Sequence, residues 1–199
     1  MLIDELLPKY DAVERHQIKI LAPARIVYEA VRELDLRDSL VVRLLFRLRE
    51  APGFFRSKRR DTRLGLTLRD LVASGFIVLG ERDNEELVLG LVGRFWTASG
   101  SIERMDAGAF HSFATPGFAK AVWNFSLTED QAGGTMLATE TRVLCLDNTS
   151  RSRFKIYWTL IAPFSGLIRN EALRVVKRAA ERKFVARASN NEGTVDKPA

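Results

Sequence analysis

The side chains that most often carry nucleophilic or metal-dependent chemistry are scarce in this sequence. It contains one cysteine, Cys145, and two histidines, His16 and His111. Nucleophilic catalysis needs a serine or cysteine beside a histidine base and an orienting acid, and nothing in the sequence places Cys145 beside His111. A cysteine at the end of a predicted strand is typical of a small core residue, and these three residues give almost no material for a zinc site. We therefore predict no catalytic residue, no metal and no cofactor.

Glu140 and Arg142 lie two residues apart in a predicted strand, so they share one of its faces and could act as a general acid–base pair. If Trp123 of the preceding strand stands opposite Thr141, apolar side chains collect on one face, and Asn124, Glu140 and Arg142 collect on the other. A register shifted by one residue mixes the two sets, and a sheet with one buried face favours the first pairing. We therefore predict that Glu140 and Arg142 point away from the core and form a partly exposed ion pair that contributes little to folding stability. The opposite orientation would favour an enzyme.

The predicted buried face combines aromatic side chains with hydroxyl groups, which is typical of a pocket for a small molecule. Thr139, Thr141 and Tyr157 are the candidates for polar contacts, and the alternative is that the aromatic residues simply fill a core. The predicted ligand-binding residues are Phe95, Trp123, Phe125, Thr139, Thr141, Phe154, Tyr157, Trp158 and Ile161.

One long amphipathic helix, predicted over residues 149–186, organises the chain. Apolar residues recur along it at helical spacing, and residues 156–168 carry no charge. An uncharged run of about 13 residues is too short to span a bilayer, which takes about 20, and is typical of a buried core helix. Pro163 lies within this run, where we expect a kink or a short break. The second half of the helix is basic, which is typical of a solvated surface.

The rest of the sequence predicts strands and short helices. Alternating apolar residues indicate strands, and apolar residues at every third or fourth position indicate helices. In chain order, the predicted elements are a strand at 16–21, two helices at 23–34 and 36–49, a short helix at 67–73, and strands at 76–81, 86–96, 118–128 and 135–146. Residues 99–116 are the least readable part, with short strands expected near Ile102 and at 109–114. Gly90 and Gly93, inside a strand, indicate a bend.

The composition is that of a globular domain. A chain of 199 residues with 46% hydrophobic and 28% charged residues is large enough to bury a core. We predict a single domain over residues 1–188 and a disordered tail over residues 189–199. Asp4 and Glu5 lie where a signal peptide would carry positive charge, so we expect a cytoplasmic protein.

The most basic stretch of the chain contains Arg56, Lys58, Arg59 and Arg60. Clustered basic side chains bind anionic lipid headgroups, so an anionic membrane surface is a candidate partner, although a charged run in a loop is also typical of a solvated segment. The net charge of +6 does not by itself indicate nucleic acid, which we do not expect as a partner. The sequence predicts no oligomeric state.

The order of the elements predicts an α+β fold in which a curved antiparallel sheet wraps around the long C-terminal helix. In this order the chain resembles the START-like superfamily, also named SRPBCC or helix-grip, which includes the birch-pollen-allergen fold and the polyketide cyclase/lipid-transport proteins. The resemblance covers residues 16–184. It lies in the strand that leads into residues 22–28, in residues 139–143, and in Phe154, Tyr157 and Trp158 at the start of the final helix.

The superfamily includes carriers, sensors, cyclases and hydrolases, so the resemblance implies a fold rather than one activity. The first expectation is a non-catalytic carrier or sensor that binds a hydrophobic small molecule or lipid in a cavity between the sheet and the C-terminal helix. The second is a cyclase- or hydrolase-type enzyme acting on an apolar or polyketide-like substrate in the same cavity. A third is an interaction module that docks through the basic stretch.

Overall fold

The computed structural model describes residues 1–35, 67–97, 101–131 and 133–192. Its strands form one antiparallel sheet in the order β1-β5-β4-β3-β2. The strands are β1 (Ala12–Ile20), β2 (Ile77–Arg82), β3 (Glu86–Gly93), β4 (Ala119–Glu129) and β5 (Thr135–Cys145). The helices are α1 (Leu2–Leu6), α2 (Ala24–Arg32), α4 (Leu68–Ala73), α5 (Ala107–Ser112) and α6 (Asn148–Glu192).

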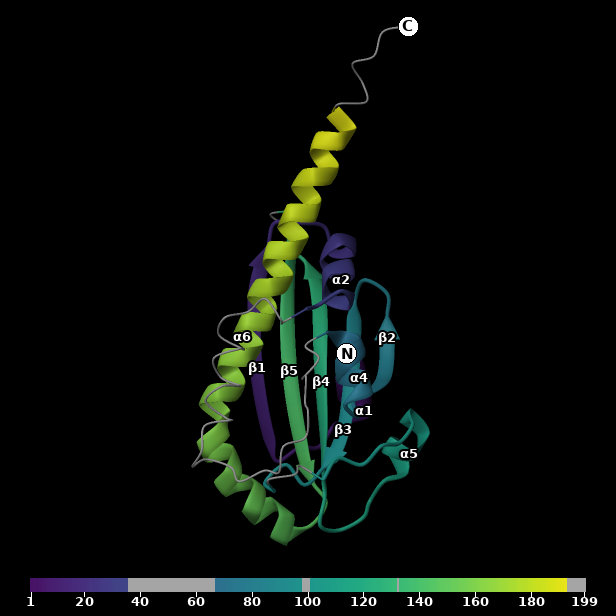
Figure 1. The fold of residues 1–199 in the computed structure, drawn as a ribbon, viewed down its shortest axis with the longest axis vertical. Helices are drawn as coiled ribbons and strands as arrows, with labels where there is room; N and C mark the ends of the chain where they lie inside the picture. Colours follow the sequence, from purple (N-terminus) through teal and green to yellow (C-terminus); the bar gives the residue numbers. More distant parts are fainter. Residues whose placement is uncertain (36–66, 98–100, 132, 193–199) are drawn as a thin grey trace, which may run out of the picture.

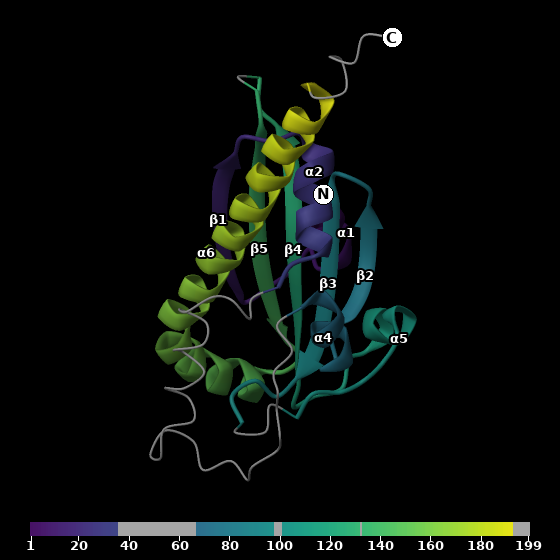
Figure 2. The same cartoon turned by 45° about the horizontal axis from the view of Figure 1, so that its top comes forward.

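Helices α2 and α6 lie on one face of the sheet, and α6 runs along it obliquely (Figure 1, Figure 2). Side chains of α2 and of the second half of α6 pack there on Leu87, Phe125 and Leu137. Helix α1 lies on the opposite face, where Ile3 packs with Val88 and other residues. The curved sheet against one long helix confirms the predicted α+β helix-grip fold.

The hairpin of β4 and β5 has the predicted register. Trp123 pairs with Thr141, and Asn124 pairs with Glu140. Because side chains alternate along a strand, Trp123 and Thr141 face α6, whereas Asn124 and Glu140 face α1. The prediction that Glu140 and Arg142 lie on the side away from the long helix is confirmed.

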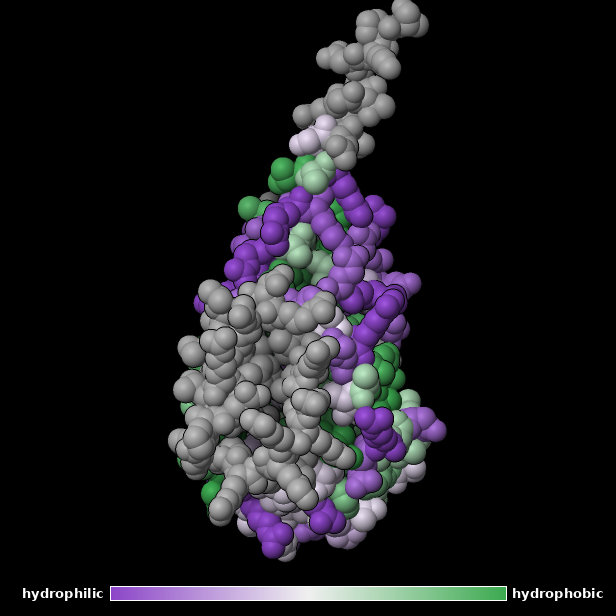
Figure 3. All heavy atoms as spheres, viewed as in Figure 1, coloured by the Kyte–Doolittle hydropathy of each residue, from purple (hydrophilic) through white to green (hydrophobic). Residues whose placement is uncertain are grey.

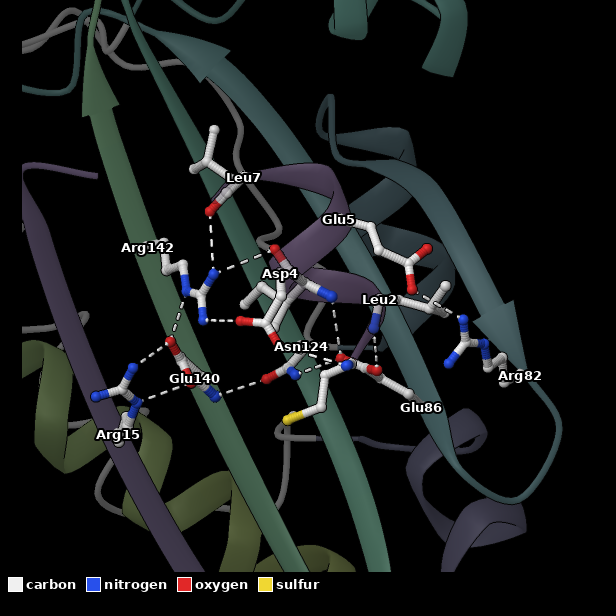
Figure 4. Close-up of polar contacts among 12 residues, drawn as sticks. Leu2, Asp4, Glu5, Leu7, Arg15, Arg82, Glu86, Asn124, Glu140 and Arg142 are labelled. Carbon is white, nitrogen blue, oxygen red and sulfur yellow. Dashed lines mark hydrogen bonds and ion pairs between the residues drawn. The ribbon is translucent and has the colours of Figure 1, made fainter. Parts of the chain in front are cut away.

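The prediction that Glu140 and Arg142 form a partly exposed ion pair is wrong. Glu140 is 8% exposed and Arg142 is 5% exposed, because α1 covers this part of the sheet (Figure 4). Arg142 Nε donates to Glu140 Oε1 at 2.6 Å, and Arg142 Nη1 donates to the carbonyl oxygens of Ile3 and Leu7 at 3.3 and 3.0 Å. The pair therefore fastens α1 to the sheet.

The other end of α1 is held by a buried carboxylate. Glu86 on β3 accepts from the backbone N–H groups of Leu2 and Ile3 at 2.6 and 3.3 Å, and from the Asn124 amide at 2.6 Å (Figure 4). An acid at a helix N-terminus and a base at its C-terminus both complement the helix dipole. A helix of five residues is too short to be stable alone, so these side chains fix its position.

Helix α6 begins after Asp147, whose carboxylate accepts from the backbone N–H of Ser150 at 2.9 Å and caps the helix. It continues to Glu192, beyond the predicted end at 186 and into the predicted tail; residues 193–199 lie outside the described residues. Pro163 does not break it, but the helix changes direction within its first half (Figure 1).

The basic second half of α6 is paired with acidic residues of and near α2. Lys183 Nζ lies 2.5 Å from Glu33 Oε2, and Arg187 Nη2 lies 2.7 Å from Glu29 Oε2. Hydrophilic side chains lie beside some exposed hydrophobic ones at this end of the molecule (Figure 3). These pairs agree with a solvated surface.

Several predicted boundaries change. Strand β1 begins at Ala12 rather than at 16, and β3 ends at Gly93, which leaves Phe95 in the following turn. The short strand expected at 109–114 is wrong, because residues 107–112 form α5, whose first turn is capped by Asp106. The short helix at 67–73 is confirmed as α4. The predicted helix at 36–49 and the basic stretch at Arg56, Lys58, Arg59 and Arg60 lie outside the described residues.

Candidate functional site

A cavity of about 310 Å³ lies between the first half of α6 and the sheet. Side chains from β3, β4 and β5 line its floor, and α6 forms its roof. Among the described residues, the lining consists of Leu71, Phe76, Leu91, Phe95, Ala121, Trp123, Thr141, Val143, Phe154, Tyr157, Trp158, Ile161, Ser165, Ile168 and Arg169. The volume is at the lower end of the range of about 300–1,000 Å³ that is usual for small-molecule sites.

Most of the predicted ligand-binding residues meet at this cavity. Those in its wall are Phe95, Trp123, Thr141, Phe154, Tyr157, Trp158 and Ile161. Phe125 and Thr139 are not in the wall: Phe125 is 1% exposed and belongs to the core beneath α2. The Thr139 hydroxyl accepts from Trp123 Nε1 at 2.6 Å and donates to the carbonyl oxygen of Asn124 at 2.7 Å. Thr139 therefore orients the tryptophan.

The aromatic side chains form two groups on opposite walls. On the sheet, Trp123 lies 4.9 Å from Phe125 and 6.4 Å from Phe76 between ring centroids. On α6, the rings of Phe154 and Trp158 are stacked with centroids 5.6 Å apart. The i, i+4 spacing of Phe154 and Trp158 places both on the same side of the helix. Flat ring surfaces on both walls suit a ligand with a flat apolar body.

Several lining residues were missed by the sequence analysis, and some of them carried a usable signal. Ala121 and Val143 have the same strand parity as Trp123 and Thr141, so they extend the same face. Arg169 follows Ile161 by eight residues, a spacing that returns to the same side of a helix.

The charged member of the lining is Arg169, which is largely buried. Its Nε donates to the Thr141 hydroxyl at 2.8 Å, and its Nη1 donates to the Ser165 carbonyl oxygen at 3.1 Å and to the Ser165 hydroxyl. The guanidinium carbon lies 6.0 Å from the centre of the Trp123 ring. Burial lowers the pKa of Arg169 below its ordinary value, and the nearby carboxylate of Glu14 opposes that shift.

On β1, Glu14 lies beside Arg169 and His16 lies beside Glu14, and neither of the two is among the residues that line the cavity. Glu14 Oε2 lies 3.5 Å from Arg169 Nη1, and Glu14 Oε1 lies 2.9 Å from His16 Nε2. A carboxylate oxygen only accepts, so His16 Nε2 is the donor. Glu14 Oε2 is buried and has no hydrogen-bond partner in the described part of the chain.

Helix α6 passes very close to β1 at this point. A Cβ atom on Gly166 would lie 2.7 Å from Glu14 Oε1 and 3.4 Å from His16 Cε1. A side chain at this position would therefore displace the Glu14 carboxylate from its present place beside the helix backbone. Close packing closes the polar end of the site on the β1 side.

Within the described ranges, no group of three or more His, Cys, Asp or Glu side chains could hold a metal ion. In the described part of the chain, no helix is both long enough and apolar enough to cross a membrane.

No family model matches this chain, and no curated protein matches it. Among solved structures, the di-domain ARO/CYC BexL from the BE-7585A biosynthetic pathway is similar at 12% identity and a TM-score of 0.39, over 89% of this chain and 53% of that chain. This chain thus spans about half the length of that structure. The Zhui aromatase/cyclase from Streptomyces sp. R1128 has 13% identity and a TM-score of 0.30, over 86% and 94% of the two chains. CalU16 from Micromonospora echinospora has 15% identity and a TM-score of 0.27, over 88% and 97%.

Proposed function

We propose that this protein binds a hydrophobic small molecule or lipid in the cavity beneath the first half of α6, as a carrier or sensor. The observation that supports the proposal best is the cavity itself, which is about 310 Å³ in volume and is walled mainly by aromatic and aliphatic side chains. An apolar cavity with a few placed polar groups is the usual form of a small-molecule site. The ligand would contact Phe95, Trp123, Thr141, Phe154, Tyr157, Trp158 and Ile161.

Binding of N-phenyl-1-naphthylamine, a neutral dye that brightens in apolar surroundings, tests this proposal. Ala121 lies in the floor of the cavity, so Ala121→Phe should fill it and weaken dye binding by about tenfold or more, or about 1.4 kcal/mol. Trp158→Ala should enlarge the cavity and favour larger probes. Leu160→Ala is the matched control, because Leu160 is 67% exposed on the outer side of the same helix.

Equal dye binding by wild type and Ala121→Phe would rule out the cavity as the binding site. Native mass spectrometry of the purified protein offers an independent readout, since a carrier retains an apolar compound through purification.

A second candidate function is a cyclase- or hydrolase-type enzyme acting on an apolar or polyketide-like substrate in the same cavity. It is favoured by the hydrogen bond between His16 and Glu14, because Glu14 also contacts Arg169, which lines the cavity. A histidine oriented by a carboxylate is a common general base. Hydrolysis of 2-naphthyl acetate by wild type, and its loss in His16→Asn, is the result expected of an enzyme; equal rates for both would leave the binding function alone.

A further inference from the structure

The guanidinium of Arg169 keeps hydrogen-bonding capacity at the wall of the cavity. Nε and Nη1 donate to Thr141 and Ser165. No acceptor within the described part of the chain contacts Arg169 Nη2. Arginine carries five N–H donors in a planar fork, so two N–H groups remain for a ligand atom. Nη2 is not one of the fully buried side-chain atoms that lack a partner in the described part of the chain, and Arg169 lines the cavity, so a ligand acceptor can take the place of solvent at this donor.

The positive charge of Arg169 is already balanced. Glu14 Oε2 lies 3.5 Å from Arg169 Nη1. The neighbouring oxygen of the same carboxylate is held by His16 at 2.9 Å, which fixes the carboxylate on β1. An isolated charge is strongly disfavoured in a low-dielectric interior, and a paired one is less so. A ligand in the cavity therefore meets an N–H donor of Arg169, whose positive charge is already balanced by Glu14.

Other polar groups near Arg169 also make contacts within the protein. Trp123 Nε1 donates to Thr139, and the Thr141 hydroxyl accepts from Arg169 Nε. The Trp123 ring, whose centre lies 6.0 Å from the guanidinium carbon, presents apolar surface to the cavity. The ligand's polar atom therefore meets Arg169, while its body meets rings.

We infer that the cavity selects an apolar, ring-containing ligand that carries one neutral hydrogen-bond acceptor, such as a ketone or amide carbonyl oxygen, and that it binds this oxygen at Arg169 and discriminates against carboxylates. This inference rests on the proposed binding function. A ligand carboxylate would place a second negative charge beside Glu14 at the same guanidinium, and like charges in a dry site repel strongly. A hydrocarbon would leave the Arg169 donor without a partner.

Three probes of the same shape separate these cases: 2-acetylnaphthalene, 2-ethylnaphthalene and 2-naphthoate. Their dissociation constants are measured by displacement of N-phenyl-1-naphthylamine at about pH 7.5, where the naphthoate carboxyl group is ionised. The ketone should bind wild type at least about tenfold more tightly than the hydrocarbon, as expected for one hydrogen bond to a charged donor. The naphthoate should bind more weakly than the hydrocarbon.

Two variants test whether the selectivity among the probes comes from Arg169 and Glu14. Arg169→Met should abolish the advantage of the ketone while hydrocarbon binding remains, and Glu14→Gln should raise naphthoate affinity at least about tenfold by leaving the Arg169 charge uncompensated. Arg174→Met is the matched control, because Arg174 is 65% exposed on the same helix. It should leave the ranking of the probes unchanged.

The outcomes separate the two proposals. No binding of any probe by wild type would overturn the proposed binding function. Equal affinity for ketone and hydrocarbon, or tightest binding of naphthoate, would overturn this inference while the binding function stands. If Arg169→Met does not fold, the wild-type ranking and the Glu14→Gln variant still decide.

Discussion

Replacing Arg142 by methionine should detach helix α1 from the sheet. The change keeps the apolar length of the side chain and removes the guanidinium. That group donates to Glu140, to the carbonyl oxygens of Ile3 and Leu7, and to Asp4 Oδ1 at 2.6 Å. The first three of these contacts are buried. In the variant the Leu7 carbonyl oxygen loses this donor, whereas the Ile3 carbonyl oxygen keeps the Leu7 N–H and Glu140 keeps Arg15.

The expected cost follows from how deeply each partner is buried. Removing one member of a buried ion pair costs about 3–5 kcal/mol. Asp4 is 55% exposed and adds little, and Glu140 retains Arg15, whose Nε lies 2.8 Å from Glu140 Oε2. We therefore expect the lower end of the range, about 3 kcal/mol, which corresponds to a fall in Tm of about 6–12 °C for a domain of this size.

Urea unfolding followed by circular dichroism measures the loss, and hydrogen exchange locates it. In the variant, the amides of residues 2–7 should lose protection before those of the sheet. Arg15→Met is the matched control: it contacts the same carboxylate, but its side chain is 57% exposed, so its loss should cost about 1 kcal/mol or less. A cost for Arg142→Met no greater than for Arg15→Met, with α1 still protected, would refute the reasoning.

Two further predictions concern ionisable groups. Burial raises the pKa of Glu140, but hydrogen bonds from Arg15 and Arg142 outweigh this effect, so the pKa in the folded state lies below the unfolded value of about 4.3. The ionised Glu140 therefore stabilises the fold fully above about pH 4.3, and this stabilisation is lost as the pH falls through the folded pKa. The difference in urea stability between wild type and Glu140→Gln should therefore shrink in acid, and a constant difference would contradict this. Burial, with the nearby carboxylate of Asp11, raises the pKa of Cys145 to about 12, so the native thiol should not react with 5,5′-dithiobis(2-nitrobenzoate) at about pH 8 and should react in urea. Native reactivity at the unfolded rate would refute that assignment.

The register of the β4–β5 hairpin was predictable because residue type alternates cleanly along both strands. Trp123 and Phe125 alternate with Asn124, and only one pairing keeps the polar set on one face. The burial of Glu140 was not predictable. It depends on α1, whose five residues are too few to show a helical period and whose position is fixed by contacts distant in sequence.

The polar end of the cavity was missed for a different reason. The predicted strand at 16–21 leaves Glu14 outside the sheet, because an edge strand with Glu14 and His16 on its inner face lacks apolar alternation. Arg169 directly follows the uncharged run of residues 156–168. Its place in the wall depends on where α6 meets β1, which local pattern does not encode.

The close approach of α6 to β1 at Gly166 connects a position outside the cavity wall with the charged pair of Glu14 and Arg169. Helix α6 lies over the cavity between Phe154, which is buried, and Gly166, which has no side chain. Gly166 is not part of the cavity wall, yet a larger residue there would displace the Glu14 carboxylate, which is paired with Arg169. The charge balance at Arg169 can therefore change through one position while every residue in the cavity wall stays the same.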